Sequence, residues 1–198
     1  YAGAILRNRG IEHMIEAASV GRDDLAWVVM GYAQDETYMA TLKAHAEELG
    51  VLGRTIFFHE AVAPGEVVRY CASADVSVIP TQRVCLSYEF EASNKIFHSV
   101  MARVPVAMSN HIEKRLLVER YGIGVLFDET DPQSIAETVA SLLDDRVAYA
   151  AACEACDRAS GELNWEHEER KLLAMFEGVS AEVSEVSEVR EVRGRETA

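Results

Sequence analysis

The 198-residue sequence is poor in several features that define specialised proteins. It contains four cysteines and four prolines, so neither a disulfide framework nor a proline-rich chain is expected. No apolar run approaches the roughly 18 to 20 residues that a membrane-spanning helix needs. Basic residues are also scarce, because 19 Lys and Arg stand against 33 Asp and Glu, which gives a net charge of −14. That charge repels phosphate backbones and, without a local basic patch, argues against nucleic acid as a partner.

The rest of the composition is typical of an ordinary globular domain, with 49% hydrophobic and 26% charged residues. The only close cysteine pair, Cys153-x-x-Cys156, lies in an Ala-rich stretch that indicates the middle of a helix. A redox pair is expected at the start of a helix instead, where the dipole lowers the thiol pKa. A zinc site would need two further ligands at matched spacing, and none is evident. We therefore expect reduced, structural thiols of a cytosolic protein and no metal site.

Short apolar runs alternate with helical patterns along the first 130 residues. The strands are predicted at 2–6, 25–30, 55–58, 75–79, 104–108 and 124–127, and the helices at 10–19, 35–49, 64–72, 93–102 and 113–121. Such alternation predicts an α/β fold with right-handed crossovers, here a doubly wound, mostly parallel, six-stranded Rossmann-like sheet. Ligands of these sheets bind beyond the carboxyl ends of the strands, so function is expected in the loops that follow them.

The remainder is predicted to be helical over 131–144 and 146–160, with a last helix capped by Asn164. From Ser180 the sequence consists largely of Glu-Val-Ser and Glu-Val-Arg triplets, whose valines build no helical stripe. We expect residues 1–178 to form the domain with its C-terminal helices, and 179–198 to be a disordered, acidic, low-complexity tail.

Generic phosphate-binding and hydrolase motifs are missing, since the sequence has no G-x-x-x-x-G-K-S/T loop, no G-x-G-x-x-G and no G-x-S-x-G. The distinctive feature is the helix start at Ser93, Asn94 and Lys95, straight after the long loop beyond the fourth strand. Free backbone N–H groups beside a lysine form an anion site that suits a diphosphate. Arg9, before the first helix, is a second potential phosphate contact. The alternative is a capped helix with surface charges.

These segments carry a resemblance. The order of Arg9-Gly10-Ile11-Glu12, Val28-Val29-Met30-Gly31, Ala74 to Pro80 and Asn94-Lys95-Ile96-Phe97 resembles the C-terminal, nucleotide-sugar-binding domain of a GT-B retaining glycosyltransferase of the family 4 type. The resemblance covers about residues 1–178. It implies an N-terminal acceptor-binding domain that this sequence lacks, with residue 1 close to where an interdomain linker enters the first strand.

By this resemblance the donor diphosphate meets Lys95, Asn94 and Arg9, and the base lies against residues 58–62. The position at which the family places a ribose-binding Glu is His98 here, and the family's other Glu falls at Phe90, between Glu89 and Glu91. The residues to which a nucleotide-sugar-binding role is thus assigned are Arg9, Gly31, Phe58, Glu89, Asn94, Lys95 and His98. Catalytic residues stay unassigned. His98 is the main departure, because neutral imidazole offers one acceptor nitrogen where a carboxylate offers two oxygens.

The leading hypothesis is the donor-binding half of a retaining glycosyltransferase. It would transfer a sugar from a UDP- or GDP-sugar to a glycan or lipid-linked acceptor, without a cofactor. The expected location is cytoplasmic, with peripheral attachment to the inner face of the membrane through the missing half. One alternative is a non-catalytic binding or scaffold module descended from such an enzyme. Another is a sugar-nucleotide epimerase of the same fold, for which no acid/base set is evident.

Overall fold

The computed structural model describes residues 1–176. They fall into two compact units, the first spanning Tyr1–Ser160 and the second beginning at Gly161. The predicted domain end at 178 and the predicted tail over 179–198 lie outside the described residues. All site residues assigned from the sequence lie in the first unit.

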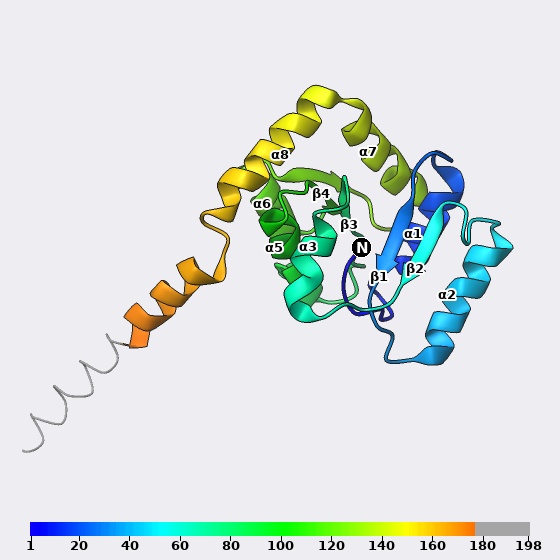
Figure 1. The fold of residues 1–198 in the computed structure, drawn as a ribbon, viewed down its shortest axis with the longest axis horizontal. Coiled ribbons are helices and arrows are strands. Elements are labelled where there is room, and N and C mark those ends of the chain that lie inside the picture. Colours follow the sequence, from blue (N-terminus) through cyan, green and yellow to red (C-terminus); the bar gives the residue numbers. More distant parts are fainter. Residues whose placement is uncertain (177–198) are drawn as a thin grey trace, which may run out of the picture. The chain divides into compact units, whose positions relative to one another are not determined.

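The first unit contains two parallel sheets (Figure 1). Strand β1 (Trp27–Met30) pairs with β2 (Ile56–His59), and β4 (Val106–Ser109) lies between β3 (Ser77–Ile79) and β5 (Gly124–Phe127). Every strand pair is parallel, because a helical crossover separates each strand from the next. The predicted α/β class with a doubly wound parallel arrangement is confirmed.

The predicted sixth strand over residues 2–6 does not form. In this segment only Ala2 and Ile5 make isolated parallel bridges, to Met30 and Ala33 at the carboxyl end of β1. Gly3, between them, has a φ of +149°, which interrupts the extended geometry of a regular strand. Within residues 1–176, five strands in two sheets therefore take the place of the single six-stranded sheet expected from the sequence.

The helices follow the predicted pattern closely. They are α1 (Ile11–Val20), α2 (Glu36–Glu48), the 3₁₀ turn η1 (Pro64–Glu66) with α3 (Val67–Cys71), α4 (Leu86–Glu89), α5 (Asn94–Met101), α6 (Ile112–Tyr121), α7 (Pro132–Asp144) and α8 (Arg146–Ser160). Asp35 caps α2 by accepting from the backbone N–H groups of Thr37 and Tyr38. Gly122, with a φ of 70°, ends α6. The one-turn helix α4 was not predicted.

The core is built where α1, α2 and α7 pack against the sheets. Ile11 and Ile15 of α1 are fully buried with Trp27 and Val29 of β1. Helix α8 contacts α5 and buries Cys156 completely. The Cys153-x-x-Cys156 pair lies inside α8 as expected, and all four cysteines are free.

The second unit is described over residues 161–176. Residues 165–176 are helical, and the carboxamide oxygen of Asn164 accepts from the backbone N–H of His167 at 2.8 Å. The predicted cap of this helix is thus confirmed. Within residues 1–176, no helix has both the length and the apolar character that crossing a membrane requires.

Candidate functional site

The loop beyond β3 meets the turn before α1. Gly10 lies directly against the backbone of Pro80, so closely that a Cβ atom on Gly10 would be 1.8 Å from the Pro80 carbonyl oxygen. The backbone N–H of Gln82 donates to the carbonyl of Asn8 at 3.0 Å. This junction places Arg9 beside the long loop that leads to α5, at the carboxyl edge of the strands.

Arg9 is held by an acidic partner. Its guanidinium donates to both carboxylate oxygens of Glu91, at 3.0 and 3.2 Å, and lies 4.7 Å from the ring centre of Tyr88. The side chains of Arg9 and Glu91 are each 19% exposed. Both hydrogen bonds come from one nitrogen, Nη1, and this charge-assisted contact neutralises the arginine. Arg9 therefore lies at the expected edge of the sheet, but its charge is already matched.

Lys95 has a different environment, at the second residue of α5. The side chain of Ser93, the N-cap residue, makes no capping hydrogen bond, while its carbonyl accepts from the N–H of Ile96 at 2.9 Å. The N–H groups of Asn94 and Lys95 are therefore the ones left for a ligand. The Lys95 ammonium lies 5.0 Å from the ring centre of Tyr1. Burial, together with the charge of Arg9, lowers the pKa of Lys95 to about 8, and Glu91 opposes the shift. Asn94, just before Lys95, is exposed.

A cluster of charged residues at the same edge contains Glu89, which was assigned from the sequence, and four residues that were not. This ionic cluster consists of Arg83, Glu89, His111, Lys114 and Glu129. Arg83 Nε lies 2.7 Å from Glu89 Oε2 and 3.9 Å from Glu129 Oε1. His111 Nε2 lies 3.4 Å from Glu129 Oε1, and Lys114 Nζ lies 3.2 Å from His111 Nδ1. The cluster joins the loops that follow β3, β4 and β5.

Two members of the ionic cluster, His111 and Lys114, are completely buried. Burial lowers the pKa of Lys114 to about 8, while the charges of Glu91 and Glu129 raise it and those of Lys95 and Arg9 lower it. Because each of these charges acts on Lys114, the cluster is electrostatically continuous with Lys95 and Arg9. One sequence signal could have shown that Lys114 is buried, since it lies one helical turn before the buried Leu117.

Both carboxylate oxygens of Glu89 are held by groups of the protein itself. Its Oε1 accepts from the backbone N–H of Ile112, the first residue of α6, at 3.1 Å, and its other oxygen meets Arg83. Glu89 is 9% exposed, whereas the neighbouring Phe90 is 57% exposed. The carboxylate thus stabilises the start of α6 and orients Arg83.

The remaining residues assigned from the sequence are Gly31, Phe58 and His98. Gly31 is required for close packing, because a Cβ atom there would be 1.8 Å from the carbonyl oxygen of Gly3. Phe58 lies in β2, as the predicted strand over 55–58 implies, and is half-buried, with Lys43 Nζ 6.0 Å from its ring centre. His98 is half-buried on α5, where burial and then the charge of Lys95 lower its pKa.

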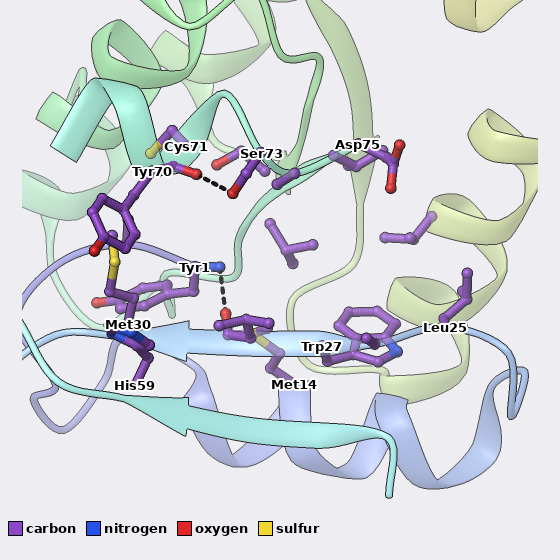
Figure 2. Close-up of a pocket in the computed structure, with 18 of the residues that line it drawn as sticks. Tyr1, Met14, Leu25, Trp27, Met30, His59, Tyr70, Cys71, Ser73 and Asp75 are labelled. Carbon is purple, nitrogen blue, oxygen red and sulfur yellow. Dashed lines mark hydrogen bonds between the residues drawn. The ribbon is translucent and has the colours of Figure 1, made fainter. Parts of the chain in front are cut away.

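Two cavities lie near the elements described above. One, of about 460 Å³, is lined by Arg83, Asn110, Asp128, Glu129 and Thr130, and therefore opens beside the ionic cluster. The other, of about 520 Å³, lies between β1 and β3 (Figure 2) and shares no residue with that cluster. Within residues 1–176, no group of three or more His, Cys, Asp or Glu side chains is arranged to hold a metal ion.

The fold and this edge define a class of protein. Solved structures that match the chain are GT-B glycosyltransferases, in which a parallel α/β domain of this kind forms one half. The family model described as glycosyl transferases group 1 matches residues 1–160, and the chain belongs to this family. The resemblance predicted from the sequence is thereby confirmed at the level of family and fold. A comparison with curated protein sequences gave no match.

Three solved structures illustrate the likeness. HepE of Anabaena, in complex with UDP and glucose, is 16% identical with a TM-score of 0.75, over 89% of this chain and 48% of HepE. Sucrose-phosphate synthase of Thermosynechococcus elongatus is 17% identical with a TM-score of 0.71, over 91% and 45%. The C-terminal domain of LpcC, a glycosyl transferase group 1 family protein of Francisella tularensis, is 19% identical with a TM-score of 0.68, over 82% and 84%. The chain thus spans about half of the first two proteins and most of the isolated LpcC domain.

Proposed function

We propose that this chain is the donor-binding half of a retaining glycosyltransferase that uses a UDP- or GDP-sugar. The observation that carries the proposal is the start of α5, where uncapped backbone N–H groups lie beside the half-buried ammonium of Lys95. A diphosphate matches both features, because it accepts several hydrogen bonds and carries the opposite charge. The HepE structures, which hold UDP or UDP-glucose, support this choice of ligand class.

In the proposed reaction this half of the enzyme stabilises the leaving group. As the bond from the sugar to the diphosphate breaks, negative charge grows on the phosphate oxygens. Lys95 and the N–H groups of α5 are fixed in advance to receive it. Asn94 is exposed at the same helix start and can donate to the same group. A glycan or lipid-linked acceptor would be bound by another domain, so the chain alone is expected to bind the donor without turnover.

A non-catalytic binding or scaffold module is the second candidate. The Arg9–Glu91 pair favours it, because Arg9 is the other cation at this edge assigned to the diphosphate and its charge is already neutralised. The position of His98 on α5 favours it as well, since imidazole replaces the ribose-binding carboxylate that the resemblance leads one to expect. The two candidates differ in a single property, the affinity of the chain for nucleoside diphosphates.

Calorimetric titration of UDP, GDP, uridine and guanosine tests the proposal. The chain is expected to bind UDP or GDP with a micromolar to low-millimolar Kd, and Lys95→Met to weaken that binding at least tenfold. Binding of the uncharged nucleoside should hardly change.

Arg54→Met is the matched control, because it removes one exposed positive charge between α2 and β2, at the amino ends of the strands. No binding of either diphosphate would support the scaffold module. Equal losses for diphosphate and nucleoside in Lys95→Met would place the phosphates elsewhere.

A further inference from the structure

Three cations act on the carboxylate of Glu91 at the proposed donor edge. Arg9 holds it directly, with hydrogen bonds of 3.0 and 3.2 Å. Burial lowers the pKa of both Lys95 and Lys114, and the charge of Glu91 opposes that shift in each of them. The three cations differ in whether a ligand can reach them, because Arg9 and Lys95 are partly exposed whereas Lys114 is completely buried.

Lys114 lies close to the segment that carries Glu91. His111 Nδ1 lies 2.9 Å from the carbonyl oxygen of Tyr88 and 3.2 Å from Lys114 Nζ, so both groups meet the same ring nitrogen. Tyr88 comes three residues before Glu91, and its ring centre lies 4.7 Å from the guanidinium of Arg9. The Arg9–Glu91 pair and the Lys114 ammonium therefore border the same short stretch of chain.

The ammonium of Lys114 is poorly matched by partners of its own. Among the described residues its one hydrogen-bond contact is His111 Nδ1, and it forms no ion pair with a carboxylate. An ammonium has three N–H donors, and a buried charge is costly unless it is paired. Burial has the largest effect on the pKa of Lys114, and the charge of Glu91 has the largest effect among the neighbouring charges. Lys114 thus retains donors for a carboxylate, and Glu91 is the carboxylate that acts on it most strongly.

A bound diphosphate would change the balance of charge around Glu91. Arg9 and Lys95 are the two cations assigned to the phosphates. A ligand that engages both of them brings phosphate oxygens next to the Glu91 carboxylate, and these groups repel each other. The carboxylate then has to find another cation or weaken binding. Lys114 stays available for it, because a completely buried side chain is not in contact with the ligand.

We propose that Lys114 is the alternative partner of Glu91. In the free chain Glu91 binds Arg9. When a nucleoside diphosphate binds, the Glu91 side chain turns to Lys114, and Arg9 is released to the phosphates. Lys114 is a positioning residue in this exchange, since it acts through Glu91 and does not touch the ligand. The choice of ligand rests on the proposed function, whereas the exchange itself involves only side chains of this chain.

A double-mutant cycle, measured by titration calorimetry with UDP and GDP, tests the exchange. Lys114→Met is expected to weaken binding about tenfold at pH 7, because Glu91 then has no partner when it leaves Arg9. In the Glu91→Gln background the same substitution should change binding by less than about twofold, since no carboxylate needs a partner. An equal loss in both backgrounds would overturn the proposal, because Lys114 would then act independently of Glu91.

Arg115→Met is the matched control for the loss of a positive charge. Arg115 is the next residue of α6 and is exposed, and no ion pair is recorded for it among the described residues. Its removal should change the affinity by less than about twofold in either background, because exposed charges are screened by water and salt. A loss equal to that of Lys114→Met would mean that only net charge matters, and it would overturn the proposed exchange.

The pH profile supplies a readout that a merely structural role would not move. The titratable and charged groups that face Lys114 are His111, Glu91, Glu129, Lys95 and Arg9. Burial lowers the pKa of Lys114 to about 8, the two glutamates oppose the shift, and Lys95 and Arg9 add to it. Lys114 therefore loses its charge as the pH rises above this value. The affinity ratio of the native chain to Lys114→Met should fall from about tenfold at pH 7 to about twofold at pH 9. A ratio that did not depend on pH would overturn the exchange.

A crystal structure of Arg9→Met tests the exchange without any ligand. The substitution takes away the present partner of Glu91, as the diphosphate is proposed to do. A carboxylate oxygen of Glu91 should then lie within about 3.2 Å of Lys114 Nζ. A carboxylate that pointed into solvent or to Lys95 would overturn the proposal. If the native chain bound neither UDP nor GDP, the proposed function would fail, and this structure would still decide whether Lys114 receives Glu91.

Discussion

At the scale of single residues, the two cations assigned to the diphosphate differ in what already holds them. Lys95 lies beside open helix N–H groups, whereas Arg9 is bound by Glu91 on both carboxylate oxygens. A ligand that used Arg9 would have to displace Glu91 or accept its repulsion. Glu91 therefore limits the affinity of this edge for anions.

Glu91→Gln is expected to strengthen UDP or GDP binding about threefold to tenfold, which corresponds to roughly 0.7 to 1.4 kcal/mol. The change removes one negative charge near both Lys95 and Arg9 and frees the guanidinium. Glu119→Gln, on an exposed position near the end of α6, is the control for net charge. Titration calorimetry at constant ionic strength measures both. Weaker binding by Glu91→Gln alone would show that the carboxylate itself holds the ligand.

His98 permits a test by pH. Burial and Lys95 lower its pKa in the free chain, and a bound diphosphate would raise it. Binding is then coupled to proton uptake and strengthens as the pH falls from 8 to 6. Lys95, with a pKa of about 8, also gains a proton as the pH falls through the upper part of this range, and this strengthens binding as well. Comparison of the native chain with His98→Glu separates the two groups.

In the glutamate variant, the part of the trend below about pH 7 should disappear, because imidazole titrates there, and the part due to Lys95 should stay. The variant should also prefer the ribonucleotide over its 2′-deoxy analogue more strongly than the native chain does. An unchanged pH profile together with unchanged discrimination would mean that residue 98 is not at the ribose.

The residues that sequence reasoning found and missed differ in how local their signals are. Asn94 and Lys95 could be predicted, because a helix start after a long loop is visible within a few positions. Arg83, His111 and Glu129 follow three different strands, and only the packing of those strands brings Arg83 and His111 each within 4 Å of Glu129. No pattern along the chain records that proximity.

At the scale of elements, apolar runs and helical patterns were enough to predict eight of the helices and all five strands found within residues 1–176. Caps such as Asp35 set their boundaries locally. The prediction of a strand over residues 2–6 was wrong. A regular strand needs hydrogen-bond partners along its length, and β1 supplies them only at its carboxyl end. Helix α4 has only four residues, which is about one helical turn. A segment that short is too small to show a helical spacing of apolar residues, so it could not be predicted.

The junction of α1 with the loop after β3 depends on Gly10. Both Gly10 and Gly50 have a positive φ, of 73° and 67°, but only Gly10 has neighbours where a Cβ would lie. Gly50→Ala should cost about 1 kcal/mol from backbone strain, and Gly10→Ala at least about 3 kcal/mol, because the backbone of Pro80 must also move. Chemical denaturation measures the difference. Equal losses would mean that the close approach at Pro80 relaxes freely.

Gly10→Ala should also weaken diphosphate binding in the fraction that stays folded, because it shifts the turn that carries Arg9. Gly50→Ala, at the end of α2, should not. If Gly10→Ala lost stability but kept full affinity for the diphosphate, the turn before α1 would not position the binding residues.

At the scale of the whole molecule, the stability of a chain prepared to start at Tyr1 is expected to depend on its free amino group. Its pKa is about 6 in the folded chain and about 8 when exposed. Between these values the unfolded chain binds more protons than the folded one, so stability is lost as the pH falls from 8 towards 6. The loss amounts to roughly 2 to 3 kcal/mol.

Thermal unfolding of a chain with Tyr1 as its first residue, released from a fusion by cleavage, measures this effect. Lowering the pH from 8 to 6 should reduce the Tm by about 4 to 10 °C. Acetylation of the amino group removes the titration and should abolish most of the difference, while His98 still contributes at the acid end. Identical pH profiles for the acetylated and free chains would show that the amino group is accessible to water.

The last prediction concerns how much of the chain makes up the folding unit. The family match and the first compact unit both end at residue 160. Helix α8 is integral to that unit, because Cys156 is fully buried and its Sγ lies 3.5 Å from the carbonyl oxygens of Val104 and Ile123. Removal of residues 180–198 should therefore leave the Tm within about 2 °C, and a chain ending at Ser160 should still unfold cooperatively and bind UDP or GDP as the full chain does. A chain ending at Asp145 loses α8, exposes the surface beneath Cys156 and should unfold without a cooperative transition. If the chain ending at Ser160 also lost cooperativity, residues after 160 would have to supply part of the core.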